Sequence, residues 1–122
     1  MSAVDTAWLR MDRPHNLMVV CGVMLFDRAV DHARLVRVVE ERFCVFRRFR
    51  QRAVEHDGAT YWEDDERFAI RRHVVRDALP GRAGKRELQA LVSRLVATPL
   101  DPAHPLWQFR LVERCGGGSA LI

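Results

Sequence analysis

The sequence predicts an α/β protein in which helices cover a mixed sheet. Three observations carry this prediction: an apolar run at 17–26, helical spacing of apolar residues at 85–97, and two alternating runs around a glycine turn at 116–118. Strand, helix, strands, helix and hairpin therefore follow one another along the 122 residues. Such an order is typical of layered α/β proteins. The length fits one small domain or part of a larger one.

The first forty-odd residues contain an opening segment, a strand and a helix. A short helical turn is expected at 7–9, and Pro14 closes the opening segment. The run from Leu17 to Phe26 predicts a strand buried on both faces, because it is apolar throughout and too short to span a bilayer as a helix. Asp31 is the expected N-cap of a helix that extends to about Phe43.

The central part predicts further strands. An extended stretch at 46–55 leads to the turn pair Asp57-Gly58, and 60–63 resumes as a strand, which is typical of a β-hairpin. Another strand is expected at 68–75, followed by a loop at 80–84.

The last part predicts a helix and a hairpin. Apolar residues at 88, 91, 92, 95 and 96 form one helical stripe, and Pro99 ends the helix. Strands at 108–112 and 120–122 then flank the glycine turn. The second strand has only about three residues, fewer than a strand normally has. We therefore expect a truncated chain with an unpaired, exposed edge at 120–122.

Composition indicates a cytoplasmic globular protein, at most peripheral to a membrane or lipid inclusions. The hydrophobic content is 48%, which excludes disorder as the general description. The three cysteines form no C-x-x-C pair, and no apolar leader opens the sequence. The net charge of +4 is carried almost entirely by arginine and is compatible with phosphate-bearing ligands, an anionic membrane or nucleic acid.

No set of residues forms a complete catalytic constellation. The five histidines lack metal-ligand spacing, so no metal site is predicted. His73 lies in a predicted strand, where a hydrogen-bonded structural role is favoured over that of a catalytic base. His104 lies between two prolines and is expected to be exposed. The four carboxylates at 63–66 are interpreted as a solvated turn rather than a cation site.

A basic stretch with aromatic neighbours, 47–52, is the one candidate for nucleic-acid binding. As a strand, it would place Arg48, Arg50 and Arg52 on the face opposite Phe49, with Arg47 sharing the Phe49 face. The charged and the aromatic side chains are therefore not sorted onto separate faces of the strand, as a nucleic-acid-binding surface would require. We expect no nucleic-acid partner.

Short motifs follow one another along nearly the whole sequence in a specific order. They are Asp5-x-x-Trp8-Leu-x-Met11, Asn16-Leu-Met18, Phe46-Arg-Arg-Phe-Arg-Gln-Arg52, Tyr61-Trp-Glu-Asp-Asp65, His73-Val74, Thr98-Pro-Leu-Asp101 and Pro105-Leu-Trp107. The ordered set resembles the N-terminal portion of the bacterial wax ester synthase/diacylglycerol acyltransferase family. Two positions depart from the family pattern: Arg47 replaces a proline, and Ala69 an aspartate.

The resemblance implies a fold like that of chloramphenicol acetyltransferase, in which 1–122 is the N-terminal, truncated part of the domain. It implies transfer of a fatty acyl group from acyl-CoA, as substrate, to a long-chain alcohol or diacylglycerol, with no resident cofactor. The family's His-His-x-x-x-Asp-Gly motif, whose second histidine is the general base, is expected just beyond Ile122. No catalytic residue is therefore assigned, and the isolated chain is expected to be inactive.

Within this resemblance, Pro105, Leu106 and Trp107 are the candidate substrate-binding residues, although a structural role for the three is favoured over lining an acyl channel. Pro105 is expected to open an edge strand, with Trp107 and Phe109 on one face and Leu106 on the other. The alternative function is a stand-alone, non-catalytic binding or dimerisation module that reuses half of the fold, with the edge at 120–122 as the site at which it could dimerise.

Overall fold

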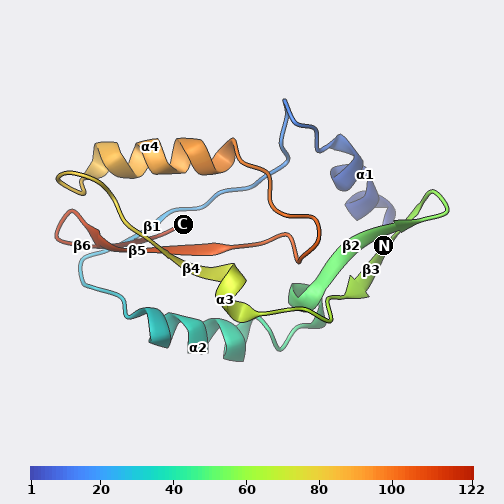
Figure 1. Cartoon of the computed structure of the whole chain (residues 1–122), viewed down its shortest axis with the longest axis horizontal. Helices are drawn as coiled ribbons and strands as arrows, with labels where there is room; N and C mark the ends of the chain where they lie inside the picture. The colour runs from blue at the N-terminus through green and yellow to red at the C-terminus, as the bar shows by residue number, and fades with distance from the viewer.

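The computed structural model describes residues 1–122, which form a four-stranded sheet between two helices and a separate two-stranded hairpin (Figure 1). The elements in chain order are α1 (Ala3–Met11), β1 (Met24–Phe26), α2 (His32–Arg42), η1 (Arg47–Arg50), β2 (Gln51–His56), β3 (Ala59–Asp64), α3 (Ile70–His73), β4 (Val74–Asp77), α4 (Lys85–Val96), β5 (Phe109–Cys115) and β6 (Gly118–Leu121).

The larger sheet is mixed, as the sequence predicts. Its strand order is β1-β6-β5-β4, in which β4 and β5 run parallel and the other neighbours run antiparallel. Helix α4 connects the two parallel strands, so β4, α4 and β5 form a β-α-β unit.

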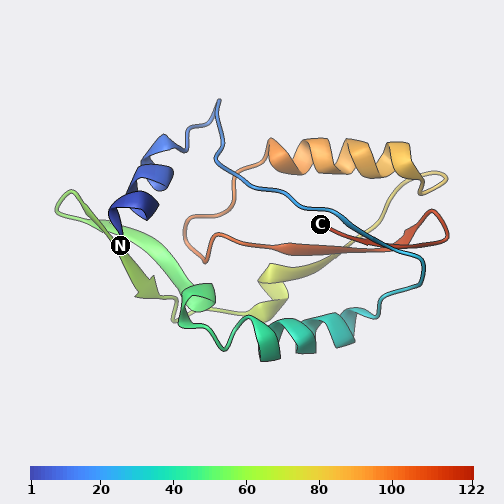
Figure 2. The ribbon, with the colours of Figure 1, turned by 180° about the vertical axis from the view of Figure 1, so that it is seen from behind.

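The two faces of this sheet are covered by different helices (Figures 1 and 2). On one face, Leu88 and Leu91 of α4 pack with Val112 and Ala120. On the other, Phe43 at the end of α2 contacts the Phe109 ring edge-on, with ring centroids 5.3 Å apart. Successive strand residues point to opposite faces, so the neighbours Leu111 and Val112 of β5, both 0% exposed, are buried against different layers.

The hairpin of β2 and β3 stands beside the layered body and carries α1 (Figure 2). Asp57 and Gly58 both have positive φ, 51° and 74°, as a two-residue type I′ turn requires. Polar side chains of α1 contact the hairpin: Thr6 and Thr60 share a hydrogen bond of 2.7 Å, and the Trp62 indole donates to Asp5 at 3.4 Å.

The helix and turn predictions are largely confirmed. The Asp31 carboxylate accepts from the Arg34 amide at 2.7 Å and caps α2, and α4 occupies nearly all of the predicted range. Helix α1 is longer than the expected turn, because the Ser2 hydroxyl caps it by accepting from the Asp5 amide.

The prediction of a fully buried strand at 17–26 is wrong. Only Met24–Phe26 is strand, and Leu25 is 70% exposed. The reason is strand order: β1 lies at the edge of the sheet and pairs with β6 alone.

Two other stretches differ from the predicted strands. Residues 47–50 form a 3-10 turn before β2 begins, and 70–73 form a single helical turn before β4. The turn α3 brings the His73 ring under Trp107, a contact between residues 34 positions apart that local alternation cannot indicate.

The expected free edge at 120–122 is also wrong. Strand β6 lies between β1 and β5, and all four of its residues are buried. Ile122 and Arg110 exchange two backbone hydrogen bonds of 2.8 and 2.9 Å. The last strand is therefore an interior strand.

None of the helices combines the length and apolar character that crossing a bilayer requires.

Candidate functional site

Trp107 joins three parts of the fold. Its indole N–H donates to the Phe49 carbonyl in η1 at 2.8 Å. Its ring meets Phe49 and Phe109 edge-on, with centroids 5.8 and 5.7 Å away, and stacks on His73 at 4.4 Å. Edge-on and stacked aromatic pairs each contribute about 0.5–1.5 kcal/mol beyond burial. Trp107 thus fixes the start of β5 against the hairpin and α3.

His73 is a structural histidine. It is only 3% exposed, and its ring packs against both Phe68 and Trp107, with centroids 5.1 and 4.4 Å away. The Phe68 and Trp107 rings also contact each other, at 6.4 Å. Nδ1 lies 2.8 Å from the Trp107 carbonyl, which can only accept, so Nδ1 carries the hydrogen. The other ring nitrogen, Nε2, is buried without a partner. Burial lowers the pKa of His73, and the Trp107 carbonyl only partly opposes this.

A second polar cluster joins Asp65, His104 and Arg72. The Asp65 side chain is 4% exposed, and its Oδ2 accepts from His104 Nδ1 at 2.8 Å. Asp65 Oδ1 accepts from the Arg67 amide at 2.9 Å. Arg72 donates to Nε2 of His104, so the hydrogen of a neutral His104 ring sits on Nδ1.

The electrostatics of Asp65 follow from these contacts. Burial raises the pKa of this carboxyl, but the hydrogen bonds from His104 and from the Arg67 amide, with the charge of Arg52, outweigh burial and leave the pKa below its ordinary value. The expectations of an exposed His104 and of a solvated turn at Asp65 are therefore wrong. The two residues are 39 positions apart, so no spacing in the sequence signals their pairing.

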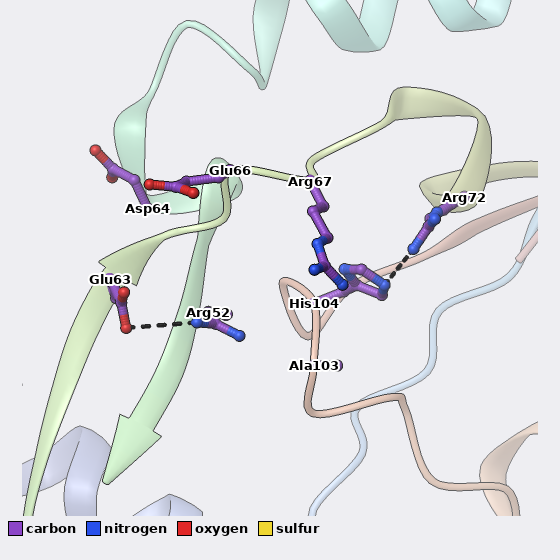
Figure 3. Close-up of a pocket in the computed structure, with 8 residues that line it drawn as sticks. All are labelled: Arg52, Glu63, Asp64, Glu66, Arg67, Arg72, Ala103 and His104. Carbon is purple, nitrogen blue, oxygen red and sulfur yellow. Dashed lines mark hydrogen bonds and ion pairs between the residues drawn. The ribbon is translucent and has the colours of Figure 1, made fainter. Parts of the chain in front are cut away.

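A hollow of about 410 Å³ opens beside this cluster (Figure 3). Its lining residues are Arg52, Glu63, Asp64, Glu66, Arg67, Arg72, Ala103 and His104. Three arginines and three carboxylates give it no dominant charge, and only Ala103 is apolar. The lining therefore suits neither a strongly charged anion nor a fatty acyl chain.

The basic stretch at 47–52 has partners within the fold. Arg47 pairs with Asp64 at 2.8 Å, and Arg52 lies 3.6 Å from Glu63. The Arg48 guanidinium lies over the Trp62 ring, 4.1 Å from its centroid. Arg47, Arg48 and Arg52 thus each have a partner on β3.

The three candidate substrate-binding residues differ in their surroundings. Pro105 is buried, Trp107 is half-buried, and Leu106 is 37% exposed. The shared face predicted for Trp107 and Phe109 is confirmed by their ring contact. Pro105 does not open an edge strand. Strand β5 begins at Phe109 and lies inside the sheet. The Trp107 amide donates back to the Pro105 carbonyl at 2.9 Å.

The sequence and fold can now be compared with known proteins. The family model for the wax ester synthase/diacylglycerol acyltransferase catalytic domain matches residues 1–120. The chain belongs to this family. A relative from Mycobacterium tuberculosis H37Rv, named as the diacylglycerol O-acyltransferase tgs3, is 33% identical over 119 residues. That alignment covers 93% of this chain and 44% of the relative.

A second M. tuberculosis protein named as a diacylglycerol O-acyltransferase is 28% identical, and the match covers 93% of this chain but 24% of that protein. Among solved structures, the wax ester synthase/diacylglycerol acyltransferase from Marinobacter aquaeolei VT8 superposes with a TM-score of 0.78 at 26% identity, covering 98% of this chain and 30% of that one. The tallysomycin biosynthesis protein TlmII, at 23% identity and a TM-score of 0.60, shares the fold.

These comparisons confirm the family resemblance and the acyltransferase-like fold drawn from the ordered motifs. They also show that the chain spans less than half the length of these relatives.

Proposed function

We propose that this chain is the N-terminal part of an O-acyltransferase that transfers a fatty acyl group from acyl-CoA to a long-chain alcohol or diacylglycerol. The match of a single acyltransferase family to residues 1–120 carries this proposal. Acyl-CoA is a substrate in this scheme, and no resident cofactor is invoked. The location we propose is the cytoplasm, with peripheral contact to membranes or lipid inclusions, because the acceptors of this reaction are lipids.

We further propose that the isolated chain does not catalyse the transfer. A general base needs a free basic nitrogen within reach of the hydroxyl that it deprotonates. His73 Nε2 is buried, and both ring nitrogens of His104 are hydrogen-bonded. His32 donates its Nε2–H to the Val74 carbonyl at 3.0 Å and keeps a free Nδ1, but it does not line the hollow beside Asp65. His15 and His56 are exposed, with no hydrogen-bond partner to orient them. The His-His-x-x-x-Asp-Gly motif does not occur in the sequence.

Pro105, Leu106 and Trp107 are proposed to serve the acyl substrate in two ways. Leu106 is the member with apolar surface available for contact. Pro105 and Trp107 position it, since the first is buried and the second is bonded to η1 and stacked on His73.

The test is ester formation from palmitoyl-CoA and hexadecanol. The chain alone should give none, whereas a chimera in which it replaces the matched part of the Marinobacter enzyme should be active. In that chimera, Leu106→Ala should raise the KM for palmitoyl-CoA several-fold with little change in melting temperature. Val45→Ala, also at an exposed apolar residue, is the matched control.

Two results would contradict the proposal. A folded chimera without acyl transfer would oppose the assigned activity. An unchanged KM in Leu106→Ala would restrict the tripeptide to a structural role.

The dimerising form of the alternative, a stand-alone module, loses its support. It required a free edge at 120–122, and that strand is paired on both sides.

A further inference from the structure

Helix α1 has its apolar face turned to solvent. Val4, Trp8 and Met11 are 66%, 52% and 49% exposed, and no residue of the helix is buried. The three share one side of the helix, because residues three or four positions apart are neighbours on its surface. With Ala3 and Ala7 they line an open hollow of about 360 Å³ that has no polar residue in its wall. The apolar stripe of a surface helix normally faces the core, and here it does not.

The contacts that fix α1 to the rest of the protein are polar. Asp5, Thr6 and Arg10 form hydrogen bonds to the hairpin of β2 and β3. Asp5 and Thr6 are half-buried there, whereas the apolar residues are exposed, at the end of the molecule where α1 stands beside the hairpin (Figure 2). The helix is therefore held by its polar side, and its apolar side is free for another contact.

The indole of Trp8 suits a boundary between water and lipid. The other two tryptophans donate their N–H groups within the chain, Trp62 to Asp5 and Trp107 to the Phe49 carbonyl. Trp8 makes no such bond, and about half of its surface is exposed. A ring with an apolar body and a free N–H is favoured at a membrane interface, where one end of the side chain is in an apolar medium and the other contacts water.

The free charges beside this face are positive. Arg10 and Arg13 donate only to backbone carbonyls and have no carboxylate partner. The carboxylates of Asp5 and Asp12, in contrast, accept hydrogen bonds from other parts of the chain. Exposed arginines beside an apolar helix face attract anionic lipid.

The size of the face favours a lipid surface over a folded protein. The face comprises five side chains, whereas each side of a standard protein interface has about 20–30 residues. Residues 12–16, which follow the helix, are charged, polar or proline, so the face does not extend along the chain. Binding to a lipid surface has no such minimum, because its strength grows with the apolar area buried and with the attraction between charges.

We infer that α1 is an interfacial anchor whose apolar face enters a lipid layer that contains anionic phospholipid. Trp8 and Met11 lie at the boundary between head groups and acyl chains in this arrangement, and Arg10 and Arg13 lie near the lipid phosphates. The inference assigns a surface and a lipid class to the peripheral lipid contact proposed above. It rests on that part of the proposed function, but not on the acyl transfer.

The experiment measures binding of the 122-residue chain to vesicles by co-sedimentation. We expect binding to phosphatidylcholine vesicles that contain phosphatidylglycerol, and about tenfold weaker binding to phosphatidylcholine alone. Val4→Asp should weaken binding to the mixed vesicles about tenfold, because a carboxylate does not enter the apolar layer. The helix should persist in this variant, since an acidic residue in the first turn is favourable. Val45→Asp makes the same change at a residue 63% exposed outside α1 and should bind like the wild type.

Fluorescence tests the lipid contact of Trp8 itself. Phosphatidylcholine brominated on its acyl chains quenches an indole that reaches them. The bound wild type should be quenched, whereas bound Trp8→Phe should not, because its remaining fluorophores Trp62 and Trp107 are held inside the fold. Phenylalanine keeps an apolar ring on α1, so this variant should still bind the vesicles.

Other results overturn the inference. They are the absence of vesicle binding, equal losses in Val4→Asp and Val45→Asp, quenching that persists in Trp8→Phe, and a homodimer that Val4→Asp dissociates, which would assign the face to a second copy. Binding that Val4→Asp leaves unchanged would assign the lipid contact to another exposed apolar stretch, such as 20–26. No acyl-CoA is present in these measurements, so an inactive chimera would leave them unaffected. An active chimera without vesicle binding would refute the anchor alone.

Discussion

Replacing Asp65 by asparagine tests whether the buried Asp65–His104 pair holds the segment before Trp107 in place. The carboxylate accepts two hydrogen bonds, from His104 Nδ1 at 2.8 Å and from the Arg67 amide at 2.9 Å. Asparagine has one acceptor oxygen, and its NH₂ group must face one of these donors. A hydrogen bond to a charged group contributes about 1.5–3 kcal/mol, so we expect a loss of about 2–3 kcal/mol.

This loss corresponds to a measurable change in melting temperature. With about 2.1 cal/mol/K of unfolding entropy per residue, a chain of this length should melt about 8–12 °C lower. Thermal and urea unfolding of the 122-residue chain, followed by circular dichroism at pH 7, would measure it. The difference should shrink in acid, because a carboxyl whose pKa is lowered in the folded state contributes stability above its unfolded pKa near 4 and loses it as pH falls through the folded value.

Asp64→Asn is the matched control. It changes the neighbouring carboxylate, whose side chain is 55% exposed in its pair with Arg47, and should leave the melting temperature close to that of the wild type. Equal effects of the two substitutions, or a change below about 0.5 kcal/mol for Asp65→Asn, would refute the assignment of Asp65 as a buried anchor.

Two further predictions concern His73 and Gly118. Because the pKa of His73 is lowered in the folded state, the wild type should lose stability as pH falls below the unfolded value of about 6.5. The His73→Phe variant should be less stable than the wild type at pH 8, but its stability should change less between pH 5 and 7, as urea midpoints would show. If its stability depended on pH as steeply as that of the wild type, His73 would not be the source of the pH dependence. Gly118→Ala should lower the free energy of unfolding by about 1–3 kcal/mol and speed deuterium exchange in β1, since the new methyl group would clash with the Phe26 carbonyl. Gly22→Ala is the control, because nothing lies within 4 Å of a Cβ at this position, and it should change neither the stability nor the exchange rate. Equal behaviour of the two variants would contradict the close approach of β1 and β6.

Elements with a strong local signal could be predicted from the sequence. The apolar stripe of α4, the Asp31 cap of α2 and the Asp57-Gly58 turn depend on backbone geometry and on neighbours within a few residues. The ordered motifs likewise identified the family, because they extend over nearly the whole chain. The sequence alone therefore determines these features.

Tertiary structure decided which apolar segments are buried and which polar groups meet. The run at 17–26 is as apolar as an interior strand, yet it lies at an edge, while the short β6 lies inside the sheet. His104 meets Asp65 across 39 positions, and α3 replaces a predicted strand where His73 meets Trp107. Strand order and buried hydrogen bonds arise from contacts between distant parts of the chain, whose free energy outweighs local preference and leaves no periodic trace in the sequence.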